Sequence, residues 1–210
     1  MNSSSAGPPK RIGVFGGAFD PPHHAHVALA EAAIGQFNLD ALHVIPTGQA
    51  WHKARALSAP EHRLAMTRLA FDGMQGVQVD ARELQRAGPT FTIDTLKALQ
   101  GENAGCRLFL FIGTDQFAAF SQWHKWEEIL EIAIICIAGR SKFALTQSQF
   151  DVYAPHNHRF SILKLPLMPV SATQIRQMIA SGKATADEAS KLVPEAVARY
   201  ISQHQLYGAG

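Results

Sequence analysis

The stretch "GVFGGAFDPPHHAHVALAEAA", Gly13 to Ala33, contains the first predicted strand, the first predicted helix and the loop between them. An apolar run ends in Gly16 and Gly17, and an acid, two prolines and three histidines follow before apolar residues recur at helical spacing. Paired glycines let the backbone approach a ligand without an intervening Cβ. The N–H groups at the start of the next helix favour an anion. The stretch therefore predicts a strand–loop–helix unit that binds phosphate.

Apolar runs alternate with amphipathic stretches along the rest of the chain. Strands are expected at 11–17, 41–46, 77–80, 107–113, 133–139 and 160–167, and later helices at 60–71, 92–100, 171–182 and 194–205. Ser58 with Glu61, and Ser171 with Gln174, have the spacing of capping boxes. The pattern predicts a doubly wound, mostly parallel, Rossmann-like α/β sheet with helices on both faces and a helical C-terminal part.

Composition narrows the class of protein. A chain of 210 residues with 47% hydrophobic residues fits one domain, expected at 11–210 after a disordered tail over 1–10. A net charge of +2 is too small for a surface that binds nucleic acid. Cys106 and Cys136 lie in apolar runs and indicate a reducing compartment. Without a signal peptide or a membrane-spanning run, we expect a cytoplasmic protein with no membrane partner.

Polar and glycine residues follow four of the predicted strands. Ligands of such sheets bind beyond the carboxyl ends of the strands. The candidates there are Gly16 with Gly17, the segment from Thr47 to Lys53, Gly113 with Asp115, and the segment from Ser171 to Arg176. An arginine near a helix start opposes the helix dipole, so Arg176 indicates a bound anion there, with an ordinary surface arginine as the alternative. Lys53 can reach an anion from its basic loop, and the Trp123 ring can stack on a planar ligand.

The histidines allow several interpretations. Neither the dinucleotide-binding fingerprint nor the Walker pattern is present. His23 and His26 are three residues apart, share one helical face and could hold phosphate oxygens. They could instead be exposed residues of a helix that begins at two prolines. With His24 and Asp20 they could also ligate zinc, and a nucleotide sensor without turnover is a further alternative.

Several motifs together resemble one family. "GGAFDPPHHAH" resembles the GGxFDPxHxGH signature of nucleotidyltransferases, and "VSATQIR", about 150 residues later, resembles their ISxTxxR signature. "IPTGQAWHK", "DARELQRAGPTFTIDTL", "FIGTDQFAAFSQWHKWEEIL" and "LVPEAVARYISQHQLY" extend the resemblance from Arg11 to Tyr207. The whole set is similar to bacterial nicotinate-nucleotide adenylyltransferases, which make deamido-NAD and pyrophosphate from ATP and nicotinate mononucleotide.

The resemblance implies a role for each matching residue. His23, His26, Lys53 and Arg176 would be catalytic, acting on phosphates without a covalent enzyme intermediate. Gly16, Gly17, Phe19, Gly113, Asp115, Ser171 and Thr173 would bind ATP, with Asp115 on ribose hydroxyls. Thr90, Phe91, Thr92 and Trp123 would surround the pyridine ring. Magnesium would be held largely by ATP phosphates, so no dedicated metal ligands are expected.

The sequence departs from the family pattern at three positions. Ala25 replaces a glycine, Phe91 replaces a tyrosine and Trp51 replaces a proline. A pantetheine-phosphate adenylyltransferase or a cytidylyltransferase of the same fold is the nearest alternative, and a nucleotide-binding regulator is the alternative from another class. The sequence does not decide between a monomer and a homo-oligomer.

Overall fold

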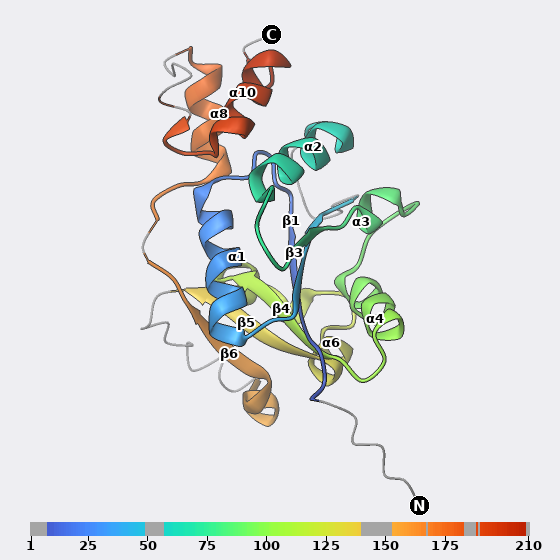
Figure 1. The fold of residues 1–210 in the computed structure, drawn as a ribbon. Helices are drawn as coiled ribbons and strands as arrows, with labels where there is room; N and C mark the ends of the chain where they lie inside the picture. Colours follow the sequence, from blue (N-terminus) through green and yellow to red (C-terminus); the bar gives the residue numbers. More distant parts are fainter. Residues whose placement is uncertain are drawn as a thin grey trace, which may run out of the picture.

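Six parallel strands form one sheet in the computed structural model, which describes residues 8–48, 57–139, 153–166, 168–182, 188 and 190–208 (Figure 1). The strand order is β3-β2-β1-β4-β5-β6, and every neighbouring pair is parallel. The strands are β1 (Arg11–Gly17), β2 (Ala41–Pro46), β3 (Val77–Val79), β4 (Arg107–Gly113), β5 (Ala133–Gly139) and β6 (Phe160–Lys164). This confirms the Rossmann-like prediction. The strand order reverses between β1 and β4, which is where such sheets bind ligands.

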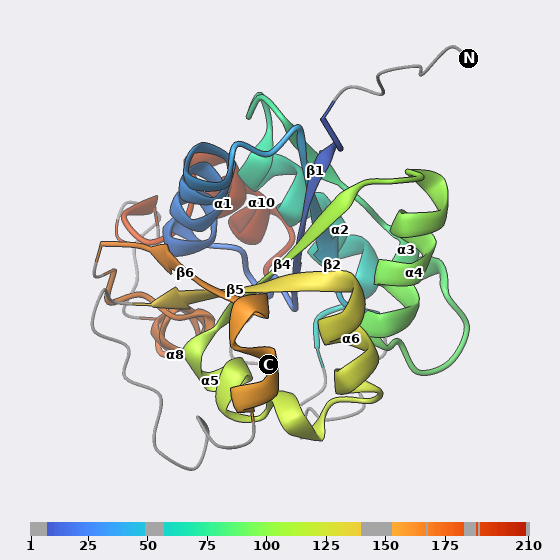
Figure 2. The ribbon, with the colours of Figure 1, turned by 90° about the horizontal axis from the view of Figure 1, so that it is seen from below.

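Helices cover both faces of the sheet. They are α1 (His24–Phe37), α2 (Pro60–Phe71), α3 (Arg82–Gln85), α4 (Thr92–Glu102), α5 (Thr114–Ala118), α6 (Trp126–Ile132), α8 (Ala172–Ala180) and α10 (Glu195–Gln203), with 3-10 turns at Phe120–Gln122 and Ala154–Arg159. Figure 2 shows α1 and α10 on one side and α4 and α6 on the other. No helix in the described part of the chain is long and apolar enough to cross a membrane.

Alternate residues of the strands build two hydrophobic cores. Phe109 and Phe111 of β4 pack with α1, α2, α8 and α10, whereas Leu108, Leu110 and Ile112 pack with α4, α5 and α6. Continuous apolar runs are therefore required, because both faces of each central strand are buried. Four strand predictions match residue for residue, at β1, β2, β4 and β5.

The edge strands are shorter than predicted. β3 ends at Val79, and β6 ends at Lys164, two residues before Pro166. Each pairs on one side only, and proline has no N–H with which to continue a ladder.

One of the two predicted capping boxes is wrong. Ser171 caps α8, since its Oγ accepts a hydrogen bond from the N–H of Gln174 at 3.3 Å. The N-cap of α2 is Ala59, and no side chain caps this helix. Ser58 has a long-range partner instead, because its N–H donates to Oδ2 of Asp20 at 3.2 Å.

Candidate active site

A cavity of about 300 Å³ lies at the carboxyl ends of β1 and β4. The start of α4, helix α5 and the residues after Phe120–Gln122 complete its wall. Seven residues predicted to bind the substrates line it together: Gly16, Gly17, Thr90, Phe91, Thr92, Asp115 and Trp123. Of the other predicted residues, those that the structure describes do not line it. Gly113 is the N-cap of α5, and Lys53 lies outside the described residues, as do Trp51 and His52.

The two glycines that end β1 have different surroundings. A Cβ built on Gly16 would meet no atom within 4 Å, so its backbone is open to a ligand. A Cβ on Gly17 would lie 3.0 Å from the Phe19 ring. Phe19 is buried in the core, with its ring centroid 5.4 Å from that of Phe15 and 5.0 Å from that of His26. Phe19 thus supports His26 from the core, and it is not among the described residues that line the cavity.

His23 and His26 stack at the start of α1. Their ring centroids are 3.7 Å apart, with 23° between the planes. The main-chain N–H of His23, the N-cap, donates to Nδ1 of His26 at 3.1 Å. In a neutral His26 the proton is consequently on Nε2. This hydrogen bond satisfies the main-chain N–H of His23, a donor at a helix start, where the helix itself provides no acceptor.

Burial determines the charge of His23. The side chain is 7% exposed, and its burial, together with the neighbouring His24, lowers the pKa of His23 to about 4. The imidazole is therefore neutral near pH 7. Its buried Nδ1 has no hydrogen-bond partner among the described residues. Such an atom is rare in folded proteins and indicates a ligand-binding group. The part of the chain that the structure describes contains no group of three or more His, Cys, Asp or Glu that could hold a metal ion.

Arg176 reaches the same loop from α8. Its Nη1 donates to the main-chain oxygen of Asp20 at 2.7 Å, and its Nη2 donates to Oγ1 of Thr173 at 3.1 Å. Ser171 stands at the N-cap of this helix. Figure 1 shows α8 and α10 at the end of the molecule where β1 finishes. Residues from opposite ends of the sequence thus meet beside His23.

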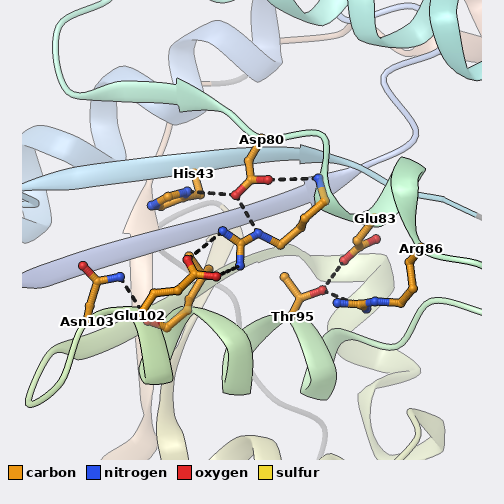
Figure 3. Close-up of polar contacts among 9 residues, drawn as sticks. His43, Asp80, Glu83, Arg86, Thr95, Glu102 and Asn103 are labelled. Carbon is orange, nitrogen blue, oxygen red and sulfur yellow. Dashed lines mark hydrogen bonds and ion pairs between the residues drawn. The ribbon is translucent and has the colours of Figure 1, made fainter.

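An acidic network borders the cavity near α4 (Figure 3). Glu83 is 8% exposed and accepts a hydrogen bond from Oγ1 of Thr95 at 2.8 Å. Burial raises the pKa of Glu83. Arg86 lies on the same side of the turn as α4, since its Nη1 donates to Oγ1 of Thr95 at 3.4 Å. The local cause is α3, a single helical turn that brings Glu83 and Arg86 to one side.

Arg82 anchors this turn. Its Nε pairs with Asp80 at 2.6 Å, and Nη1 and Nη2 each donate to a Glu102 oxygen at 3.0 Å. Bidentate pairing of this kind fixes orientation as well as distance. The short α3 is therefore held to β3 and to the end of α4.

Sequence reasoning missed several residues at the site. Glu83, Thr95 and His124 line the cavity, and the His124 ring lies 4.3 Å from that of Phe91. Arg63 is 2% exposed, with Nη1 donating to the main-chain oxygens of Thr47 at 2.7 Å and Ala18 at 3.1 Å. A charged residue on the apolar face of the predicted helix was the available signal for Arg63.

A family model described as cytidylyltransferase-like matches residues 14–178. A probable nicotinate-nucleotide adenylyltransferase of Albidiferax ferrireducens is 50% identical over 198 residues, covering 94% of this chain and 98% of that protein. A second one, of Methylibium petroleiphilum, is 39% identical over 203 residues, covering 97% and 95%.

Solved structures have the same fold. A Plasmodium falciparum nicotinic acid mononucleotide adenylyltransferase complexed with NaAD gives a TM-score of 0.75 at 18% identity, covering 94% of this chain and 97% of that chain. A putative nicotinate-nucleotide adenylyltransferase from Vibrio parahaemolyticus gives 0.66 at 21% identity, covering 94% and 95%.

Proposed function

Because the chain belongs to the nicotinate-nucleotide adenylyltransferases of the cytidylyltransferase-like family, we propose that it transfers the adenylyl group of ATP to nicotinate mononucleotide. The products are deamido-NAD and pyrophosphate. The observation that supports this best is the stacked His23–His26 pair at the start of α1. Arg176 binds the loop before this helix at Asp20, and β1, which precedes the loop, ends at a cavity of about 300 Å³. A cavity of this size suits a pyridine ring and its ribose.

The chemistry needs positioned cations and donors more than it needs a base. A phosphate oxygen of the mononucleotide forms a bond to the α-phosphorus of ATP, and the bond from that phosphorus to the pyrophosphate oxygen breaks. The nucleophile is already an anion, so no proton has to be removed and no covalent enzyme intermediate forms. Nε2–H of His26 and the neutral imidazole of His23 donate to the α-phosphoryl oxygens, and Arg176 binds the leaving pyrophosphate. Lys53 is proposed as a further phosphate ligand.

The remaining residues are proposed to bind ATP. Gly16, Gly17 and Gly113 admit the nucleotide, Asp115 accepts hydrogen bonds from ribose hydroxyls, and Ser171 with Thr173 holds the triphosphate. Magnesium fits this donor set as an ion carried by ATP phosphates, because the Asp20 carboxylate is already bound by Ser58 and Tyr207. The ion would neutralise phosphate charge.

The pyridine side of the cavity is proposed to select the acid over the amide. Phe91, His124 and Trp123 offer ring faces, and no side chain caps the start of α4 at Thr92. Main-chain N–H groups at a helix start favour a carboxylate. Thr90, which is 8% exposed, adds a buried hydroxyl that has no partner among the described residues. An amide would present an N–H₂ donor to these donors, at a cost of about 1–3 kcal/mol.

Pyrophosphate release tests the function. ATP is combined with nicotinate mononucleotide, nicotinamide mononucleotide or pantetheine phosphate, and the dinucleotide formed is identified. We expect kcat/KM for the acid to exceed that for the amide by about 10-fold or more. A ratio near one, or a preference for pantetheine phosphate, would reject this assignment. ATP binding without pyrophosphate release would favour the nucleotide-binding regulator.

A further inference from the structure

Asp20 connects three remote parts of the chain to the loop between β1 and α1. It is 1% exposed. Its Oδ2 accepts from the N–H of Ser58 at 3.2 Å, its main-chain oxygen accepts from Nη1 of Arg176 at 2.7 Å, and its Oδ1 accepts from the hydroxyl of Tyr207 at 2.6 Å. A carboxylate buried beside a site for polyanions is costly unless donors surround it. The position of this loop therefore depends on those donors.

Tyr207 supplies its donor from the turn that follows α10. The N–H of Leu206 donates to the oxygen of Ile201 at 3.0 Å, and Tyr207 has a φ of 65°, so the chain folds back after the helix. The hydroxyl also lies 3.9 Å from Sδ of Met66 on α2. Burial is the larger cause that raises the pKa of Tyr207, and the hydrogen bond to Asp20 raises it further. The hydroxyl is therefore protonated at neutral pH and acts as a donor.

We propose that Tyr207 is a positioning residue for ATP, acting through Asp20 on Arg176. This inference rests on the proposed function. The Arg176 guanidinium is held by Asp20 and Thr173, each through a different nitrogen. Movement of Asp20 removes one of these two supports. The described residues that line the cavity do not include Asp20, Arg176 or Tyr207. A change at Tyr207 should therefore weaken binding of the triphosphate and not of the pyridine ring.

Tyr207→Phe tests the proposal, with Tyr200→Phe as the matched control. Both variants lose one hydroxyl from the C-terminal part, but the hydroxyl of Tyr200 pairs with Nδ1 of His62 at 3.0 Å. Tyr207→Phe should weaken ATP binding about 10-fold or more, because a hydrogen bond to a charged group is lost. The KM for the mononucleotide should change little, and a melting curve checks that the variant is folded under the assay conditions. Equal weakening of both substrates, or the same loss in Tyr200→Phe, would overturn the proposal.

A double-mutant cycle tests the route through Arg176. In an Arg176→Ala background, Tyr207→Phe should add less than about a 2-fold further loss of ATP affinity. Full additivity would overturn the proposed route. Calorimetry with ATP alone supplies these affinities without turnover. If the wild type binds ATP and Tyr207→Phe weakens it, the inference holds even where no dinucleotide forms and the proposed function fails. A wild type that binds no ATP would reject both.

Discussion

At the scale of single residues, the hydrogen bond at Nδ1 of His26 determines which ring nitrogen carries the proton. Nδ1 accepts from the N–H of His23, so in a neutral imidazole Nε2 is the donor, and it is proposed to bind a phosphoryl oxygen. His26→Ala should lower kcat about 100-fold or more, because such donors act mainly in the transition state. Single-turnover rates and a melting curve check this. His24→Ala is the neighbouring control, and near-normal turnover in His26→Ala would contradict the role.

Arg176 should affect the two substrates unequally. Its guanidinium lies beside Asp20 and is proposed to bind the leaving pyrophosphate. Arg176→Ala should therefore weaken ATP more than nicotinate mononucleotide. Arg176→Lys should restore only part of the loss, since an ammonium cannot reproduce the planar fork of donors. Separate dissociation constants for the two substrates measure this, and equal weakening would exclude the assignment.

If only main-chain groups bound the carboxylate, alanine at Thr90 or at Thr92 would leave the preference for the acid mostly intact. The structure separates the two residues, because the hydroxyl of Thr90 is buried without a partner among the described residues. Thr90→Val should raise the KM for nicotinate mononucleotide about 10-fold, whereas Thr92→Ala should change it little. Steady-state kinetics with both variants decide this, and equal effects would argue against a role for the Thr90 hydroxyl.

At the scale of elements, the contact between the end of β2 and α3 has no spare room. A Cβ on Gly48 would lie 2.2 Å from the main-chain oxygen of Glu83, and a backbone atom cannot rotate away. Gly48→Ala should therefore displace α3 and lower the free energy of unfolding by about 2 kcal/mol or more. Denaturant unfolding at pH 7 is the measurement.

Gly35 in α1 provides the opposite case. A Cβ there would meet no atom within 4 Å, and the position is inside a helix. Gly35→Ala should raise the free energy of unfolding by about 0.5–1 kcal/mol, because alanine loses less backbone entropy on folding. If Gly48→Ala proved as harmless as Gly35→Ala, the tight contact with α3 would be discounted.

Elements were predictable from the sequence where burial is uniform along a segment. β4 and β5 match their predicted bounds because their apolar runs pack on both faces. The edge strand β6 does not match its predicted end, because it pairs with a neighbouring strand on one side only. Helix α3 has four residues, too few for a periodic signal. Ser58 has the spacing of a cap, but a partner 38 residues away takes its N–H.

The residues of the site differ in the same way in how far the sequence predicts them. Gly16 and Asp115 were predictable because parallel strands bring their carboxyl ends to one edge, where both residues line one cavity, whereas Thr90 was expected only from the family resemblance. Arg63 and Tyr207 were not, because their partners are main-chain oxygens or a carboxylate in other segments. No local pattern reports pairings of that kind.

At the scale of the whole molecule, His23 links stability to pH. Its pKa falls from 6.5 in the unfolded chain to about 4 in the folded protein. The unfolded chain therefore takes up the proton first as the pH falls, so this contribution is complete above pH 6.5 and is lost on the way to about pH 4. The loss should be on the order of 3 kcal/mol.

Denaturant unfolding at pH 7 and at pH 4.5 measures this contribution. His23→Asn should flatten the dependence between the two pH values, because asparagine carries no titrating group and still suits an N-cap. His158→Asn is the control, since His158 is exposed. An unchanged slope in His23→Asn would show that other groups dominate acid unfolding.

The contacts of Asp20 have a consequence for the order in which the protein matures on the ribosome. Arg176 and Tyr207 follow Asp20 by 156 and 187 residues, so translation delivers the glycine loop long before its last partners. Until the turn after α10 emerges, the Asp20 carboxylate lacks the hydroxyl of Tyr207, and until α8 emerges the main-chain oxygen of Asp20 lacks the guanidinium of Arg176. A nascent chain would thus carry strands and helices of the sheet before it could hold a nucleotide firmly. On the proposed roles of Arg176 and Tyr207, firm binding of ATP is acquired late in synthesis, after these two residues have emerged.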